Sequence, residues 1–182
     1  GLGDVYKRQN LSHDHLDYHK TSRDYLKSKL YLFERLLEKK GNIITDNSIK
    51  EYKKIKSITS KKKVNLFTIS NKKKGFLRLI SNGYHAEKQK IEILYKNKIY
   101  ELKIDLIGKI QIKNLLMAMI AAEKSNLTFV NIIKAAKNIK PVYGRLEKIG
   151  RLKNNALVIL DYAHTPDAVS YTHLTLPTTP YV

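Results

Sequence analysis

The sequence predicts an α/β fold with a small antiparallel insertion. Segments of helical periodicity alternate with short apolar segments from about residue 21 to residue 138, and this alternation is typical of a sheet flanked by helices. Residues 75–104 instead hold three consecutive strand-like segments, which indicate the insertion. The continuous apolar run at 156–160 (ALVIL) is typical of a strand covered on both faces. The length of 182 residues fits one domain or one and a half.

The first predicted helix begins after Thr21 or Ser22, either of which can cap it, with Asp24 in its first turn. We expect Gly41 to end this helix and residues 42–45 (NIIT) to form a short buried strand. The apolar positions of the helix recur at helical spacing (Tyr25, Leu26, Leu30, Phe33, Leu36 and Leu37).

The remaining elements follow from the same two periodicities. We expect helices at 48–57, 112–124 and 129–138, and strands at 64–70, 75–81, 90–95 and 98–104. The last two strands flank Lys96 and Asn97, which predicts a hairpin although its turn has no glycine.

The composition limits the class of protein. Of the 35 basic residues that give a net charge of +19, 29 are lysine and 6 are arginine. A nucleic-acid-binding module is one reading of this charge, but the lysine clusters at 53–56, 61–63 and 72–74 contain no interleaved aromatic residue, so we expect none. The absence of cysteine excludes disulfides and thiolate metal sites. No apolar run approaches the roughly 20 residues of a membrane span, so we expect a cytoplasmic protein without membrane association.

Imidazole and carboxylate groups are concentrated in residues 10–19 (NLSHDHLDYH). Such groups suit a divalent cation or acid–base chemistry, although a polar turn that caps the next helix has the same composition. The candidates are His13, Asp14, His15, Asp17 and His19.

Lys29 lies four residues after Tyr25 and four before Phe33, on or beside the apolar face of the first helix. A lysine there can extend its amine to water. Alternatively, it can lose its charge on desolvation, and an uncharged amine can add carbon dioxide to become a metal-binding carbamate. The spacing leaves both readings open.

Two further segments have the character of a ligand site. Gly144 and Arg145 form a predicted turn, and Asp161 and His164 follow the apolar run at 156–160. Ligands of open α/β sheets bind beyond the carboxyl ends of the strands, where a carboxylate commonly holds ribose hydroxyls.

Taken in order, NLSHDHLDYH, SKLYLF, IGKIQIKNLLMAMIAA, PVYGRLE and VILDYAHTPDA resemble the Mur ligase family, more narrowly its MurE-type members. The resemblance covers residues 10–168 and implies a Rossmann-like, P-loop-type central ATPase domain at 10–155, incomplete, followed by the start of a C-terminal domain at 156–169. Residues 1–9 and 170–182 match nothing in the family, and we expect them to be foreign to it.

The resemblance also implies roles for single residues. His15 matches a magnesium ligand, and Lys29 matches the carbamylated lysine that helps to place a second magnesium ion. Gln111 and Asn114 match the adenine-side pattern Asn-x-x-Asn, with glutamine in place of its first asparagine.

Three more residues match the nucleotide site of the family. Arg145 matches an arginine near the nucleotide, Asp161 the aspartate that contacts the ATP ribose, and His164 a histidine beside the phosphates.

The implied activity is an ATP-dependent ligase that adds the third amino acid, diaminopimelate or lysine, to UDP-N-acetylmuramoyl-L-Ala-D-Glu through an acyl phosphate, with ATP and Mg²⁺ and as a monomer. A folylpolyglutamate- or cyanophycin-type amide ligase is the alternative within the superfamily. The sequence has no GxxxxGK[ST] phosphate loop. We therefore expect a fragment of the enzyme that has no activity alone.

Overall fold

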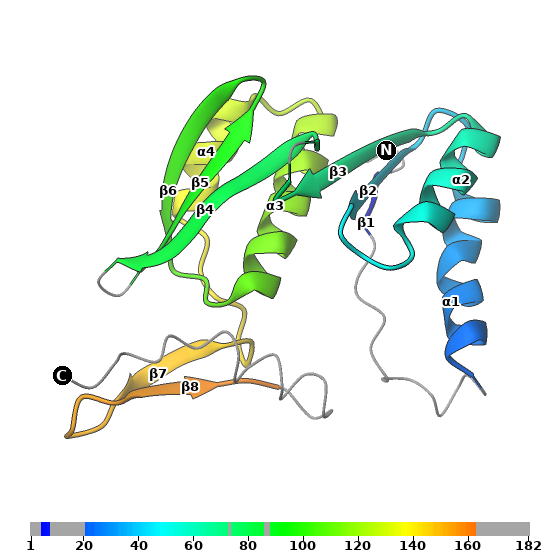
Figure 1. Cartoon of the computed structure of the whole chain (residues 1–182). Coiled ribbons are helices and arrows are strands. Elements are labelled where there is room, and N and C mark those ends of the chain that lie inside the picture. Colours follow the sequence, from blue (N-terminus) through cyan, green and yellow to red (C-terminus); the bar gives the residue numbers. More distant parts are fainter. Residues whose placement is uncertain (1–4, 8–20, 73, 86–87, 163–182) are drawn as a thin grey trace.

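The computed structural model describes residues 5–7, 21–72, 74–85 and 88–162 (Figure 1). Its larger sheet has six strands in the order of the chain. The strands β1 (Val5–Lys7), β2 (Asn42–Asp46) and β3 (Asn65–Ser70) are parallel. The connection from β1 to β2 contains α1 (Ser22–Tyr31) and the π-helix η1 (Leu32–Leu36), and the next one contains α2 (Tyr52–Lys62). This alternation confirms the predicted α/β class.

The predicted antiparallel insertion is confirmed, and it extends the same sheet. Strand β4 (Leu77–His85) pairs parallel with β3, and β5 (Lys88–Tyr95) and β6 (Lys98–Ile104) continue from it in antiparallel pairs. The β5–β6 turn places Lys96 at φ 45° and Asn97 at φ 62°. Two positive φ values are what a tight hairpin with type I′ geometry requires, so the hairpin closes there without glycine.

Helices cover both faces of the large sheet. Helices α1 and α2 lie on one face, and α3 (Lys109–Lys124) and α4 (Phe129–Lys137) lie on the other (Figure 1). Neighbouring residues of β2 serve the two layers, because side chains alternate along a strand. Ile43 packs in the cluster with Leu30, Phe33 and Ile55, whereas Ile44 packs in the larger cluster with α3 and α4, and both isoleucines are fully buried.

The first helix begins as predicted but ends earlier. The Thr21 side chain accepts a hydrogen bond from the Asp24 amide, which confirms the cap. The prediction that Gly41 ends this helix is wrong, because the helical turns stop at Leu36 and the residue with positive φ is Lys40. Gly41 is small for a different reason: a Cβ there would lie 2.4 Å from Leu37 Cδ1, and Leu37 is buried.

The structure also differs from the predicted element boundaries at the second helix and at the start of the chain. The predicted helix at 48–57 lies at Tyr52–Lys62, because the Ser48 amide and hydroxyl both bond the Asp46 side chain and hold the preceding residues in a turn. Residues 1–9 have no predicted element, and within them Val5–Lys7 form a strand that pairs with β2.

The prediction of a strand covered on both faces at 156–160 is wrong. Strand β8 (Leu157–Leu160) pairs with β7 (Glu147–Arg151) in a separate two-stranded antiparallel sheet. Leu157 and Leu160 are 36% and 40% exposed. An apolar run is buried only where further layers cover it, and among the described strands β7 alone pairs with β8.

None of the helices in the described part of the chain has the length and apolar character needed to cross a membrane.

Candidate nucleotide site

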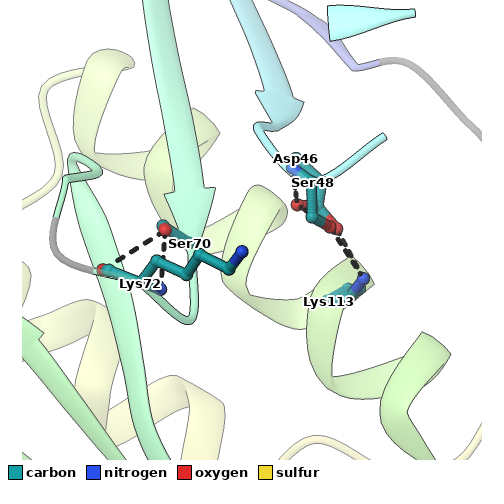
Figure 2. Close-up of polar contacts among 5 residues, drawn as sticks. All are labelled: Asp46, Ser48, Ser70, Lys72 and Lys113. Atoms are coloured by element: carbon teal, nitrogen blue, oxygen red, sulfur yellow. Dashed lines mark hydrogen bonds and ion pairs between the residues drawn. The ribbon is translucent and has the colours of Figure 1, made fainter. Parts of the chain in front are cut away.

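A buried carboxylate marks the carboxyl end of β2 (Figure 2). Asp46 is 5% exposed, and its Oδ2 lies 2.6 Å from Lys113 Nζ in an ion pair that joins β2 to α3. Its Oδ1 accepts hydrogen bonds from the Ser48 amide at 2.8 Å and the Ser48 hydroxyl at 2.7 Å. Burial raises the pKa of Asp46, but Lys113 and Ser48 stabilise the carboxylate and together hold that pKa below its ordinary value.

Hydrogen bonds between side chains and backbone groups fix the neighbouring end of β3. At the end of β3 the Ser70 hydroxyl accepts a hydrogen bond from the Lys72 amide at 2.9 Å (Figure 2). Asn47, which follows β2, donates from Nδ2 to the Lys74 carbonyl at 2.7 Å. The segments that follow β2 and β3 are therefore hydrogen-bonded to each other at one edge of the sheet.

The first two turns of α3 reach from this edge to the linker before β7. Gln111 and Asn114 flank Lys113, and both are partly exposed. Gln111 Nε2 donates to the Arg145 carbonyl at 3.2 Å. One helical segment thus contacts Asp46 through Lys113 and the predicted Gly-Arg turn through Gln111.

That turn is held in an uncommon backbone conformation. Gly144 has φ 65°, and Leu146, which is buried, has φ 49°. A positive φ strains a residue with a side chain and persists only where its surroundings enforce it. Here the Leu146 amide donates to Asp161 Oδ1 at 3.2 Å, and the Gly144 amide donates to Glu147 Oε2 at 2.9 Å.

Arg145 projects from this turn beside the end of β8. Its guanidinium carbon lies 5.2 Å from the centroid of the Tyr162 ring, and the Tyr162 amide donates to the Gly144 carbonyl at 2.7 Å. The structure therefore brings Gln111, Arg145 and Asp161 together. Planar amide, guanidinium and carboxylate groups in one place can bind the base and sugar of a nucleotide.

Lys29 occupies the expected position on α1. It is partly buried, and its Nζ lies 4.4 Å from the centroid of the Tyr25 ring. This contact is favourable for an ammonium ion and unfavourable for an anionic carbamate, so a carbamylated side chain would have to turn away from the ring.

The remaining histidine and aspartate candidates of the sequence lie outside the described residues. They are His13, Asp14, His15, Asp17, His19 and His164. Within the described ranges no group of three or more His, Asp or Glu side chains gathers in a way that could hold a metal ion.

Asp46, Lys113 and Glu147 were missed by the sequence analysis. For Asp46 a signal existed: it directly follows a predicted buried strand, which is the same observation that singled out Asp161. No local pattern marks Lys113, because its partner is distant in the chain.

Comparison with known proteins shows the family of this chain. Residues 8–122 match the model of the Mur ligase middle domain. UDP-N-acetylmuramoyl-L-alanyl-D-glutamate–2,6-diaminopimelate ligase of Rickettsia bellii is 34% identical over 160 residues, which are 88% of this chain and 32% of that protein. The chain thus spans about a third of the length of such relatives.

Solved structures show the same fold. A structure of a UDP-N-acetylmuramoyl-L-alanyl-D-glutamate–2,6-diaminopimelate ligase matches 94% of this chain and 35% of its own, with a TM-score of 0.75 and 22% identity. MurF ligase from Thermotoga maritima, solved in complex with ADP, matches 96% of this chain and 40% of its own, with a TM-score of 0.78 and 17% identity. Because the family model matches more than half of the chain, the chain belongs to the Mur ligase family.

Proposed function

We propose that this chain is the nucleotide-binding core of an ATP-dependent ligase that adds an amino acid to UDP-N-acetylmuramoyl-L-Ala-D-Glu in peptidoglycan synthesis. The observation that carries the proposal is the grouping of Gln111, Arg145 and Asp161 where α3, the linker and β8 meet. The relatives named as diaminopimelate ligases support this substrate, and favour diaminopimelate over lysine. The ADP complex of a MurF ligase with the same fold supports ATP as the nucleotide.

Each residue of the group has a role that suits its chemistry. The side-chain amides of Gln111 and Asn114 would hydrogen-bond the edge of the adenine base. The Asp161 carboxylate would accept from ribose hydroxyls, and Arg145, with His164, would offset the charge of the phosphates. Asp161 also holds the turn that carries Arg145 through the Leu146 amide, so a change at Asp161 would affect both.

We assign Mg²⁺ to His15 and to Lys29 in its carbamylated form. Magnesium would neutralise charge on the transferred phosphoryl group, because phosphoryl transfer depends mainly on positioning and on electrostatic stabilisation. The support is the DHLDYH motif and the partly buried position of Lys29. Carbamylation can be tested directly: ¹³C-labelled bicarbonate should give a carbamate signal with the wild-type chain and none with Lys29→Arg.

The wider assignment follows the same reasoning. We place the central domain at 10–155 and the start of the C-terminal domain at 156–169. The enzyme would act as a monomer in the cytoplasm, without nucleic acid or membrane.

The base-and-ribose site can be tested by titrating the ¹⁵N-labelled chain with ATP. We expect amide shifts concentrated in the first turns of α3 and at 144–147, and a weaker affinity in Gln111→Ala and Arg145→Ala. Shifts spread evenly over the lysine-rich residues 50–74 would refute the proposal, because they would indicate nonspecific attraction of the phosphates.

A further inference from the structure

We propose that Asp46 is a positioning residue for the base end of the nucleotide site, acting through Lys113. This inference rests on the function proposed above, because it takes Gln111 and Asn114 as the residues that meet the base. Asp46 itself touches neither of them in any contact that the structure shows.

The first step is that Asp46 is a rigid anchor. It ends β2, where it pairs with Ile69 of β3, and it is nearly inaccessible to solvent. Both hydrogen bonds to its Oδ1 come from Ser48, two residues on, so the carboxylate is oriented by its own strand and turn. Its Oδ2 is thereby aimed at α3, where Lys113 meets it at 2.6 Å (Figure 2).

The second step is that the start of α3 needs this anchor. Its N-cap is Gly108, which provides no side-chain hydrogen bond, and its first turn contains no acidic residue. Lys109 and Lys113 instead place positive charge near the end of the helix where the backbone dipole is also positive. A carboxylate supplied from β2 offsets this charge and fixes the direction of the Lys113 side chain.

The third step is that Lys113 lies between the two proposed base contacts. Gln111 precedes it by two residues and Asn114 follows it directly, so the orientation of this turn sets both amides. Gln111 Nε2 donates a hydrogen bond to the Arg145 carbonyl at 3.2 Å. The turn that carries Arg145 is also held by the bonds of the Leu146 amide to Asp161 and of the Tyr162 amide to the Gly144 carbonyl, which do not involve α3. Rotation or fraying of the first turns of α3 would therefore move the base contacts relative to Arg145 and leave the sugar and phosphate contacts in place.

The test compares two ligands that differ only in the base. AMP and ribose 5-phosphate are each titrated into the ¹⁵N-labelled chain, as wild type and as Asp46→Asn, Lys113→Met and Lys113→Arg. Lys90→Met is the matched control, because Lys90 pairs with Glu101 at 2.9 Å on β5 and β6, outside the nucleotide site. Thermal unfolding of each variant fixes a temperature at which all of them are folded.

We expect Asp46→Asn and Lys113→Met to bind AMP roughly three- to tenfold more weakly, as the loss of about one neutral hydrogen bond would give. Binding of ribose 5-phosphate should not change, and Lys113→Arg should recover most of the AMP affinity. Lys90→Met should bind both ligands like the wild type. If Asp46→Asn does not fold, the two Lys113 variants decide the question.

The two hypotheses fail in different ways. If the wild-type chain prefers AMP and both Asp46→Asn and Lys113→Met keep that preference, the positioning role is wrong and the base site stands. An equal loss for AMP and ribose 5-phosphate would also overturn it, because a purely structural tie would weaken both ligands. If the wild type itself does not distinguish the two ligands, the base site and the positioning role both fail.

Discussion

Replacing Lys113 by methionine would leave the Asp46 carboxylate buried at the end of β2 without its cationic partner. Methionine keeps an unbranched stem and a similar helix propensity, so α3 should keep its own stability. The variant should therefore have a lower free energy of unfolding at neutral pH, and the deficit should report the ion pair rather than the helix.

The size of the deficit follows from the exposure of the two partners. Removing one partner of a fully buried pair costs roughly 3–5 kcal/mol, and exposed pairs contribute about 0.2–1 kcal/mol. Here the Asp46 side chain is 6% exposed and the Lys113 side chain 35% exposed, and Ser48 still donates two hydrogen bonds. We expect about 1–2 kcal/mol at pH 7, or a fall in Tm of roughly 2–8 °C.

The deficit should also depend on pH. Burial alone raises the pKa of Asp46, and Lys113 with Ser48 lowers it below 3.8 in the folded chain. A carboxyl group with a lowered folded-state pKa contributes stability above its unfolded pKa and loses it as the pH falls through the folded value. In Lys113→Met the Asp46 pKa loses the lowering by Lys113, so the carboxyl group of the variant protonates at a higher pH than that of the wild type. The difference between wild type and Lys113→Met should therefore be full at neutral pH and shrink as the pH falls through the pKa of the variant toward that of the wild type.

Urea denaturation at neutral and acid pH measures both effects, with Lys90→Met as control. Lys90 and Glu101 are 40% and 48% exposed, so that variant should lie within about 0.5 kcal/mol of the wild type. Equal stability of Lys113→Met and wild type at pH 7 would refute the reasoning. A deficit that persists unchanged at acid pH would show that lost packing, and not charge, causes it.

Three further predictions concern stability and are checked by thermal or urea denaturation. Gly41→Ala should lower the free energy of unfolding by about 1–3 kcal/mol, because the new Cβ would lie 2.4 Å from the side chain of buried Leu37. In the control Gly150→Ala the new Cβ would meet nothing within 4 Å, so this variant should stay within about 0.5 kcal/mol of the wild type. Tyr84→Phe should be neutral or stabilising by up to about 1 kcal/mol, because burial raises the Tyr84 pKa to about 12 and its hydroxyl has no hydrogen-bond partner among the described residues; a clear loss would contradict this. Lys63→Gly should stabilise by about 0.5–1 kcal/mol, since Lys63 ends α2 at φ 55°, and no gain would mean that its side chain compensates.

Local patterns were sufficient for most of the fold. The cap at Thr21, the strand before Asp46 and the turn at Lys96 and Asn97 all depend on residues within a few positions of one another. The errors arose where a distant partner decides. Strand β7 has one apolar residue, Ile149, and forms because β8 lies beside it. Gly41 was read as a helix end, although its packing against Leu37 is what requires a glycine.

The residues of the candidate site likewise fall into those that a local pattern predicts and those that depend on a distant partner. Asp161 was found because it follows an apolar run, and Arg145 because it follows a glycine in a turn. The contact of Asp46 and Ser48 with Lys113 could not be found, since Ser48 and Lys113 are 65 residues apart and only the sheet brings them together. The left-handed backbone of Leu146 was equally hidden, because Asp161, which follows β8, enforces it from 15 residues away.

These contacts give α3 a role that neither its sequence nor its burial alone would suggest. One face of the helix packs on the sheet, and its first two turns carry a bond to the sheet edge through Lys113 and a bond to the linker through Gln111. The linker turn is itself bound to Asp161, which follows β8, through the Leu146 amide. The residues proposed for base, ribose and phosphate are therefore connected through one helical segment. A change in the position of β8 would be transmitted to Gln111, and a change at Asp46 would be transmitted to the same residue from the opposite side.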